Sequence, residues 1–148
     1  MADKPAELLL FDFLTAAVAS AAAGSPLDGI ELHDTVYRTI TKERGLRIGE
    51  AMSQFVPTGD GIKELNAQLT LVVWSKVPGP DQKQRADSMQ DVFDITAAVT
   101  ELLFADPSLG GKVCDVEIQS GNRGYDELDA KPYAVANIPL MINVASQG

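Results

Sequence analysis

Apolar side chains recur at helical spacing in two long segments of the chain. Residues 6–23 are rich in leucine and alanine and contain no glycine or proline, and Gly-Ser-Pro at residues 24–26 ends the segment. A second helical pattern spans residues 81–105, where Asp81 followed by Gln84 is typical of a capping box at a helix start. The pattern therefore predicts two main helices. The positions expected to be buried on the second helix are Met89, Val92, Ile95, Thr96, Val99, Leu102 and Leu103.

Alternating apolar and polar positions predict strands in the rest of the chain. The alternation is clearest at residues 67–77, 113–120 and 132–144, and it is weaker at residues 35–40 and 46–56. The last two clear strands are expected to form a long hairpin. The element order of helix, strands, helix and long hairpin predicts an α+β fold, in which two main helices pack on a largely antiparallel sheet of four to five strands.

Proline, glycine and charge mark the connections of this predicted sheet. Residues 57–61 form a turn cluster, and residues 121–131 are longer and more charged than a tight turn requires, so they are expected to be a loop. Pro139 cannot donate a hydrogen bond to a ladder. Its strand is therefore expected at an edge of the sheet, or bulged at this residue.

The strand at residues 67–77 has an amphipathic second face. One face is apolar throughout, and the other carries Thr70, Val72, Trp74 and Lys76. This second face is expected to be only partly covered within one subunit. It is therefore a candidate surface for a neighbour.

Chain length and cysteine content fit one ordinary domain. The 148 residues are expected to form a single domain, residues 1–148, large enough to bury a core without disulfides or metals. The one cysteine, Cys114, excludes an intramolecular disulfide and favours a cytoplasmic origin. Cys114 alternates with Val116 and Ile118, so it is expected to be a small buried side chain rather than a nucleophile.

The N-terminal apolar segment has to be compared with a signal peptide or a membrane span. The residues before it carry no net positive charge, and Asp12 interrupts the apolar run at residues 8–24. The segment is therefore expected to be a buried helix, and no membrane partner is expected.

The net charge of −9, from 12 basic and 21 acidic residues, argues against binding of nucleic acid through its phosphates. One basic cluster departs from this background, at Arg38, Lys42, Arg44 and Arg47. It is either a solvated turn or a patch that meets an acidic surface of another copy, such as residues 126–129, and fixes the register of a head-to-tail contact.

Motifs for catalysis are missing from the sequence, which has no phosphate-binding loop, dinucleotide fingerprint, zinc-protease motif or nucleophile elbow. Glu31, His33 and Asp34 are the nearest candidates for a metal or acid–base site, but no second histidine completes a transition-metal shell, and a solvated loop is the favoured interpretation. The acids at 126, 127 and 129 lack the spacing of a calcium loop. No catalytic residue, metal or cofactor is expected.

Four segments together resemble a known family. They are the strand Leu-Thr-Leu-Val-Val-Trp at residues 69–74, the long helix at 81–105, the turn Ala-Asp-Pro-Ser-Leu-Gly-Gly at 105–111, and the final strand that starts Tyr-Ala-Val-Ala at 133. Over residues 67–145 the chain resembles the tail terminator, or tail completion, proteins of long-tailed bacteriophages. Length and element order also resemble this family.

The resemblance implies a structural virion protein without catalytic activity. Such a subunit forms a homohexameric ring on the completed tail tube, ends polymerisation of the tail tube protein and offers the joining surface for the head–tail connector or stopper protein. The implied location is the tail or neck of the virion, after assembly in the host cytoplasm. DNA passes through the lumen without specific binding, which the acidic composition would favour.

A closed ring needs two different surfaces on each subunit. The hypothesis for these surfaces assigns side-chain contacts to the second face of the strand at 67–77, register to the basic cluster, and docking to the tube or connector to residues 121–131. The residues proposed for subunit or tube contacts are Arg44, Arg47, Val72, Trp74, Arg123, Tyr125 and Asp126.

Three other functions stay open on the sequence. The first is another neck, baseplate or tail-like injection-system component of the same fold, because fold does not fix the partner. The second is a small metal-dependent enzyme that uses Glu31, His33 and Asp34. The third is a small-ligand-binding domain with a pocket between the first helix and the sheet.

Overall fold

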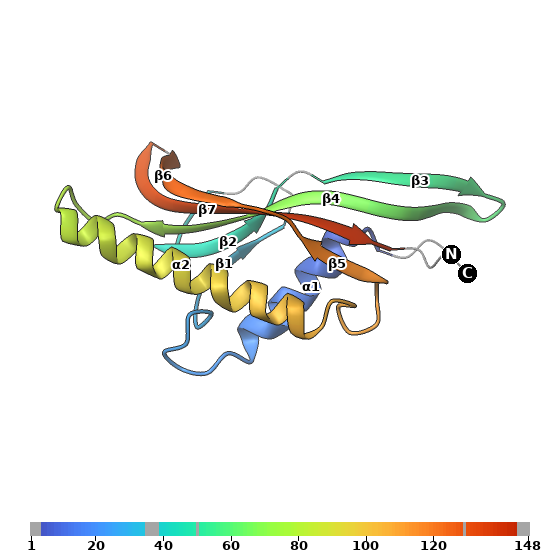
Figure 1. The fold of residues 1–148 in the computed structure, drawn as a ribbon, viewed down its shortest axis with the longest axis horizontal. Coiled ribbons are helices and arrows are strands. Elements are labelled where there is room, and N and C mark those ends of the chain that lie inside the picture. Colours follow the sequence, from blue (N-terminus) through green and yellow to red (C-terminus); the bar gives the residue numbers. More distant parts are fainter. Residues whose placement is uncertain (1–3, 35–38, 50, 129, 145–148) are drawn as a thin grey trace.

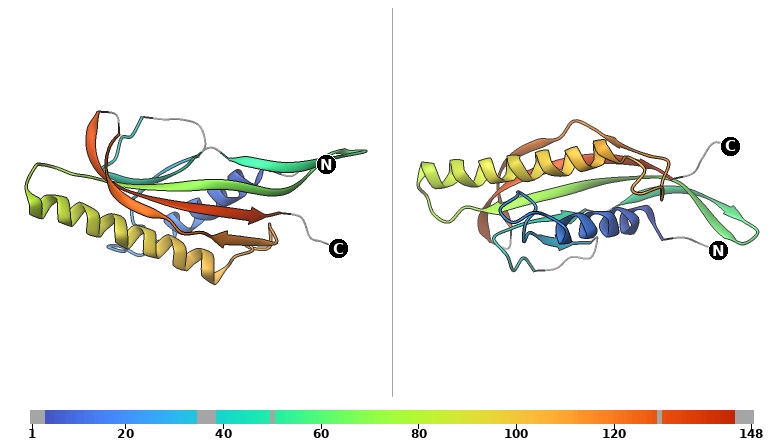
Figure 2. Two further views of the ribbon diagram at one scale, coloured as in Figure 1. Left: turned by 45° about the horizontal axis from the view of Figure 1, so that its top comes forward. Right: turned by 90° about the horizontal axis from the view of Figure 1, so that it is seen from below.

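The computed structural model describes residues 4–34, 39–49, 51–128 and 130–144. Two helices and a sheet form an α+β fold, as predicted, and both helices lie on the same side of the sheet (Figures 1 and 2). The elements are α1 (Ala6–Ala19), β1 (Glu31–His33), β2 (Arg44–Ile48), β3 (Met52–Thr58), β4 (Gly61–Lys76), α2 (Gln82–Ala105), β5 (Asp115–Ile118), β6 (Asn122–Leu128) and β7 (Lys131–Asn143).

The sheet has seven strands within the described residues, more than the four to five predicted. Its main order is β1-β2-β4-β7-β5, with β3 pairing β4 and β6 pairing β7. Every pairing is antiparallel except that of β1 with β2. Strands β4 and β7 are therefore the centre of the sheet, and β3 and β6 lie at opposite edges.

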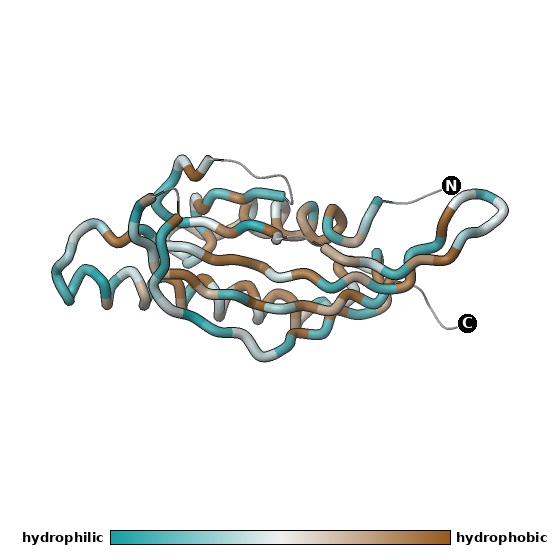
Figure 3. Tube along the Cα trace, turned by 90° about the horizontal axis from the view of Figure 1, so that it is seen from above, coloured by the Kyte–Doolittle hydropathy of each residue, from teal (hydrophilic) through white to brown (hydrophobic). Residues whose placement is uncertain are grey.

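The main core lies between the sheet and the two helices. Alternate residues of β4 and β7 point at the helices and bury completely, which the period of two along each strand explains. Apolar positions along the sheet and α2 are visible as brown segments in Figure 3. The core residues of β4, β7 and α2 are Leu69, Leu71, Val73, Ala134, Ala136, Ile138, Leu140, Ile142, Val92, Ile95, Val99 and Leu103.

The second predicted helix is confirmed and the first is shorter than predicted. The carboxylate of Asp81 accepts a hydrogen bond from the backbone N–H of Lys83, so Asp81 caps α2. Helix α1 ends at Ala19 rather than at residue 23. The hydroxyl of Ser20 donates to the carbonyl of Ala16, a side-chain bond that competes with continuation of the helix.

The weakly patterned middle of the chain was predicted incorrectly in part. The strand expected at residues 46–56 is two strands, since β2 ends at Ile48 and β3 begins at Met52. Most of the strand expected at residues 35–40 lies outside the described residues. The turn expected at 57–61 is confirmed but tighter, because Thr58 already pairs with Gly61.

The predicted loop at residues 121–131 is wrong. Most of it is β6, which pairs along β7 and turns so tightly that Leu128 is opposite Lys131. Strand β5 pairs with the far end of β7, so the expected long hairpin is one strand, β7, with two partners in succession. The charged side chains misled the prediction because an edge strand can carry charge without loss of pairing.

Pro139 lies in a central strand, contrary to the prediction. It is opposite Thr70, whose carbonyl accepts from Gly49 and so faces β2. Pro139 therefore faces the other way, where its carbonyl accepts from the N–H of Gln119. The missing N–H falls where β5 has ended and β6 has not begun, so no ladder bond is lost.

Cys114 is exposed, contrary to the prediction of a buried side chain. It lies just before β5, where the alternation of the strand does not yet apply, and the preceding residue, Val113, is buried in the core instead. Val116, inside the strand, is buried as predicted.

Candidate assembly surfaces

The sheet divides the seven proposed contact residues between its two faces. We call the face that points away from the helices the open face. Arg47 is opposite Val72, Trp74 is opposite Val135, and Asp126 is opposite Tyr133, all with side chains on the open face. Arg44, Arg123 and Tyr125 instead lie on the helix side.

Trp74 is 0% exposed, so it is not available for direct contact with a neighbour. It packs with Tyr133 and Val135 in a second buried cluster on the open face, and partly buried Leu128 packs against this cluster. Its indole N–H donates to the carbonyl of Lys42 at 3.4 Å. Helix α1 does not cover it. The neighbouring strands and the chain beside them cover Trp74. Val72 is partly buried at the edge of the same cluster.

Glycine is required beside Trp74. A Cβ on Gly45 would lie 2.3 Å from Cζ2 of the indole and 2.7 Å from the carbonyl oxygen of Glu31. The His33 ring also lies beside the indole, with ring centroids 5.6 Å apart. This close approach holds β1 and β2 over the tryptophan.

Arg44 is engaged within the chain, and its proposed role in register between copies stays a prediction. Its guanidinium makes two hydrogen bonds to the carboxylate of Asp91 on α2, at 2.9 and 3.0 Å. It also donates to the carbonyls of Pro26 and Asp28, at 2.6 and 3.0 Å. Arg44 therefore ties β2 to α2 and to the connection after α1. Arg47 stays partly exposed on the open face and remains a contact candidate.

Arg123 and Tyr125 face α2 from β6. The guanidinium of Arg123 lies 5.6 Å from the ring centre of Phe93, and that of Arg85 lies 4.4 Å from the ring centre of Tyr125. The Tyr125 hydroxyl also donates to the carbonyl of Arg85. These contacts fix β6 against α2 and leave Tyr125 and Phe93 about half exposed.

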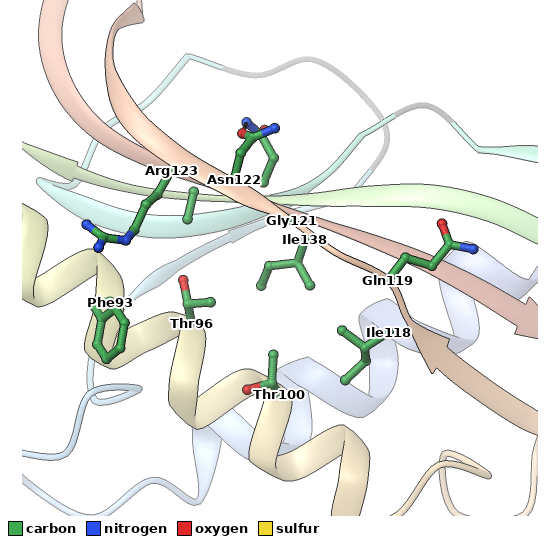
Figure 4. A pocket seen from close by; sticks show the side chains of 11 residues that line it. Phe93, Thr96, Thr100, Ile118, Gln119, Gly121, Asn122, Arg123 and Ile138 are labelled. Atoms are coloured by element: carbon green, nitrogen blue, oxygen red, sulfur yellow. Dashed lines mark hydrogen bonds between the residues drawn. The ribbon is translucent and has the colours of Figure 1, made fainter.

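A cleft of about 250 Å³ lies beside these contacts, between α2 and the β5–β6 edge. Figure 4 shows Thr96, Thr100 and Ile138 around it, with Phe93 and Arg123 at one end. The hydroxyl of Thr96 is buried and has no hydrogen-bond partner among the described residues. The cleft opens where β5 and β6 leave β7 uncovered.

Glu31 and His33 lie in β1, not in the solvated loop that was favoured. Burial alone would raise the pKa of Glu31, but hydrogen bonds from Thr41 and Lys42 and the nearby His33 outweigh it, so the pKa lies below its ordinary value of 4.5. The His33 Nε2 is 3.5 Å from the carboxylate, and the imidazole is buried. These side chains are used in packing and capping of the 40–42 segment.

Metal-ligating side chains do not gather in the described parts of the chain. Within them, no group of three or more histidine, cysteine, aspartate or glutamate side chains is arranged to hold a metal ion. Among the same residues, no helix is long and apolar enough to cross a membrane.

Sequence reasoning missed the most exposed apolar surface. Strand β3 and residues 61–64 of β4 form a two-stranded arm that extends past the part of the sheet covered by the helices (Figure 1). Met52 is 78% exposed, and Phe55 and Ile62 are each 53% exposed, with Val56 beside them. The signal in the sequence was a turn cluster with apolar residues on both sides and no facing helix pattern.

Comparison of the chain with models of known protein families finds no match. A search of curated proteins also finds no similar chain.

Proposed function

We propose that this chain is a structural virion protein that caps the phage tail tube as a ring. In this role it ends tube polymerisation and provides the joining surface for the head connector. The partners are further copies of the chain in a homohexamer, the tail tube protein and the head–tail connector or stopper. The protein works without catalysis, in the tail or neck of the virion.

The arm is the observation that carries the proposal. Four large apolar side chains lie on a two-stranded ribbon, and a two-stranded hairpin is marginally stable in water by itself. Phe55 and Val56 are consecutive in β3, so their side chains point to opposite faces, and both faces of the ribbon expose apolar side chains. Exposed apolar surface of this kind marks contacts with another protein. An assembly protein needs such a surface on every copy.

The segments that resemble tail terminators also form the centre of the fold. The strand at 69–74 lies in β4, the long helix is α2, and the strand that starts at 133 is β7, paired directly with β4. The turn at residues 106–111 follows α2, where Asp106 accepts from the N–H groups of Leu109 and Gly110. The resemblance thus rests on elements that pack together.

Charge supports the expected passage of DNA. At a net charge of −9 per subunit the ring would repel phosphate, so DNA would bind little to the wall of the lumen. Electrophoretic mobility of linear DNA should be unchanged by the protein at low salt, where any phosphate binding would be strongest.

The proposed function is tested by measuring whether the protein stops the growth of tail tubes. Native mass by light scattering and negative-stain images are measured first, and a discrete hexamer with a central hole is expected. The protein is then added to polymerising tail tube protein. Tubes that stop growing and carry a ring at one end support the function. Tubes that elongate unchanged and bind no protein overturn it.

A further inference from the structure

We propose that the arm of one copy docks in the α2–β6 cleft of the next copy, with the Phe55 ring inserted in the cleft. This contact rests on the proposed function to the extent that both need self-association. It names the two surfaces that a ring requires.

The topology excludes contact of the arm with its own cleft. The arm belongs to the edge of the sheet on the β2 side of β4, whereas the cleft lies at the opposite edge, beside β5 and β6. The arm also extends away from β6 (Figures 1 and 2). Two complementary surfaces on opposite edges of one subunit produce a head-to-tail contact, which closes into a ring when the rotation permits.

The cleft fits an aromatic side chain. An apolar cavity of about 150 Å³ is large enough to hold benzene. The cleft measures about 250 Å³ and is lined mainly by apolar surface, including Ile118, Ile138 and Phe93. Phe55 is the one phenyl group on the described arm, and it is half exposed. An aromatic ring at the centre of a contact is the usual anchor of a protein interface.

Polar groups at the two surfaces also match. The buried Thr96 hydroxyl lacks a partner among the described residues, and a backbone carbonyl on the free edge of β3 would supply an acceptor. Asp60 and Lys63 are exposed on the arm, and Arg123 is an exposed cation that lines the cleft, so Asp60 is the arm residue that would pair with it. Opposite charges at the rim of an interface favour correct register.

The other large groove is a weaker receptor. It measures about 440 Å³ between α1 and α2 and is lined largely by small side chains such as Ala17, Ala21 and Ala98. Within the described residues it holds no buried polar group without a partner. Nothing in it selects an aromatic ring.

Mixing two defective variants tests the contact. The arm variant carries Phe55→Ser and Ile62→Ser and keeps its cleft. The cleft variant carries Thr100→Trp, which fills the cleft, and keeps its arm; Phe93→Asp is a second cleft variant if the first does not fold. Each is measured alone and in a 1:1 mixture by sedimentation velocity, beside the wild type. Phe104→Ser is the matched control, because Phe104 is 74% exposed and lies outside the cleft.

Each variant alone is expected to associate about thirtyfold more weakly than the wild type, the effect of losing an interface hot spot. The mixture is expected to form dimers and no larger species, because only one intact arm and one intact cleft remain per pair. The control should assemble as the wild type does.

Three outcomes overturn the contact. They are single variants that associate like the wild type, a mixture that stays monomeric, and a wild type that is monomeric at every concentration. The first two outcomes would still allow a ring that is held together by other contacts. Tube capping, measured separately, decides the proposed function in all three cases.

Discussion

Strand β4 runs through two regions that differ in the exposure of their apolar side chains. Near its end, Trp74 is 0% exposed inside a cluster closed by neighbouring strands, whereas near its start Ile62 is 53% exposed on the arm. Both residues lie in one continuous strand, so local sequence does not distinguish them. The difference lies in the strands that pair with β4. At Trp74 both β2 and β7 pair with it, whereas at Ile62 only β3 does.

This comparison assigns stability to one region and assembly to the other. Substitutions in the Trp74 region should lower the free energy of unfolding and leave association unaffected in molecules that remain folded. Substitutions on the arm should weaken association and leave the free energy of unfolding nearly unchanged.

Trp74→Ala should cost about 3–5 kcal/mol of unfolding free energy, because it empties a fully buried indole site. Denaturant unfolding of the monomer measures this loss. The matched control is Tyr125→Ala, an aromatic side chain of which 45% is exposed. A Trp74→Ala protein as stable as the wild type would show that the cluster on the open face contributes little.

Gly45→Ala should cost about 1–3 kcal/mol, since the new methyl group would overlap the indole and the Glu31 carbonyl. Thermal unfolding measures the effect. Gly124→Ala is the control, because a Cβ there meets no atom within 4 Å. Equal losses in both variants would contradict the close approach.

Arg44→Ala should cost about 1–2 kcal/mol, because it removes charge-assisted hydrogen bonds to Asp91 and two carbonyl contacts. A double-mutant cycle with Asp91→Asn isolates the part due to the ion pair. The sum of the single losses should exceed the loss of the double variant. Additive losses would mean that the two side chains do not interact in solution.

The contribution of Glu31 should depend on pH. Its folded pKa lies below the ordinary 4.5, so its stabilising effect is present above that value and is lost as pH falls through the folded pKa. The difference in melting temperature between wild type and Glu31→Gln should therefore shrink as the pH is lowered from neutral to below 4.5. A difference that stays constant would show that the charge has no role.

Phe55→Ser should change monomer stability by about 0.5 kcal/mol or less, because surface substitutions seldom do more. Its effect should appear in association instead. Unfolding at a concentration where the wild type is monomeric separates the two effects. A loss as large as that of Trp74→Ala would mean that the arm is part of the folding core, and the comparison within β4 would fail.

The sequence predicted those elements whose patterns are long and regular. Helix α2 and the buried positions of β4 and β7 follow from spacing alone, because many residues repeat the same period. The prediction was wrong in the middle of the chain, where β2 and β3 are short. It was also wrong at β6, because the charged side chains of this strand resemble those of a loop. Spacing also says nothing about neighbours across the sheet, so it could not show that Trp74 is covered or that Arg44 is held by Asp91.

The contact residues show the same limit. Arg47, Val72 and Asp126 lie on the open face, but Arg44, Arg123 and Tyr125 make contacts within the chain that only the tertiary fold brings together. The arm was missed because exposure depends on the absence of a covering element. No single segment of sequence contains that information.

Pro57 gives the arm a consequence for solubility. A free, apolar edge strand is a template on which other chains can add strands without limit, and this leads to aggregation. Pro57 lies in β3 and has no N–H, and a register shift interrupts the β3–β4 ladder at Gln54 and Phe55. Both features break the regular row of backbone groups that a fibril would extend. The arm can therefore bind another protein through its side chains and still be a poor template for fibrils.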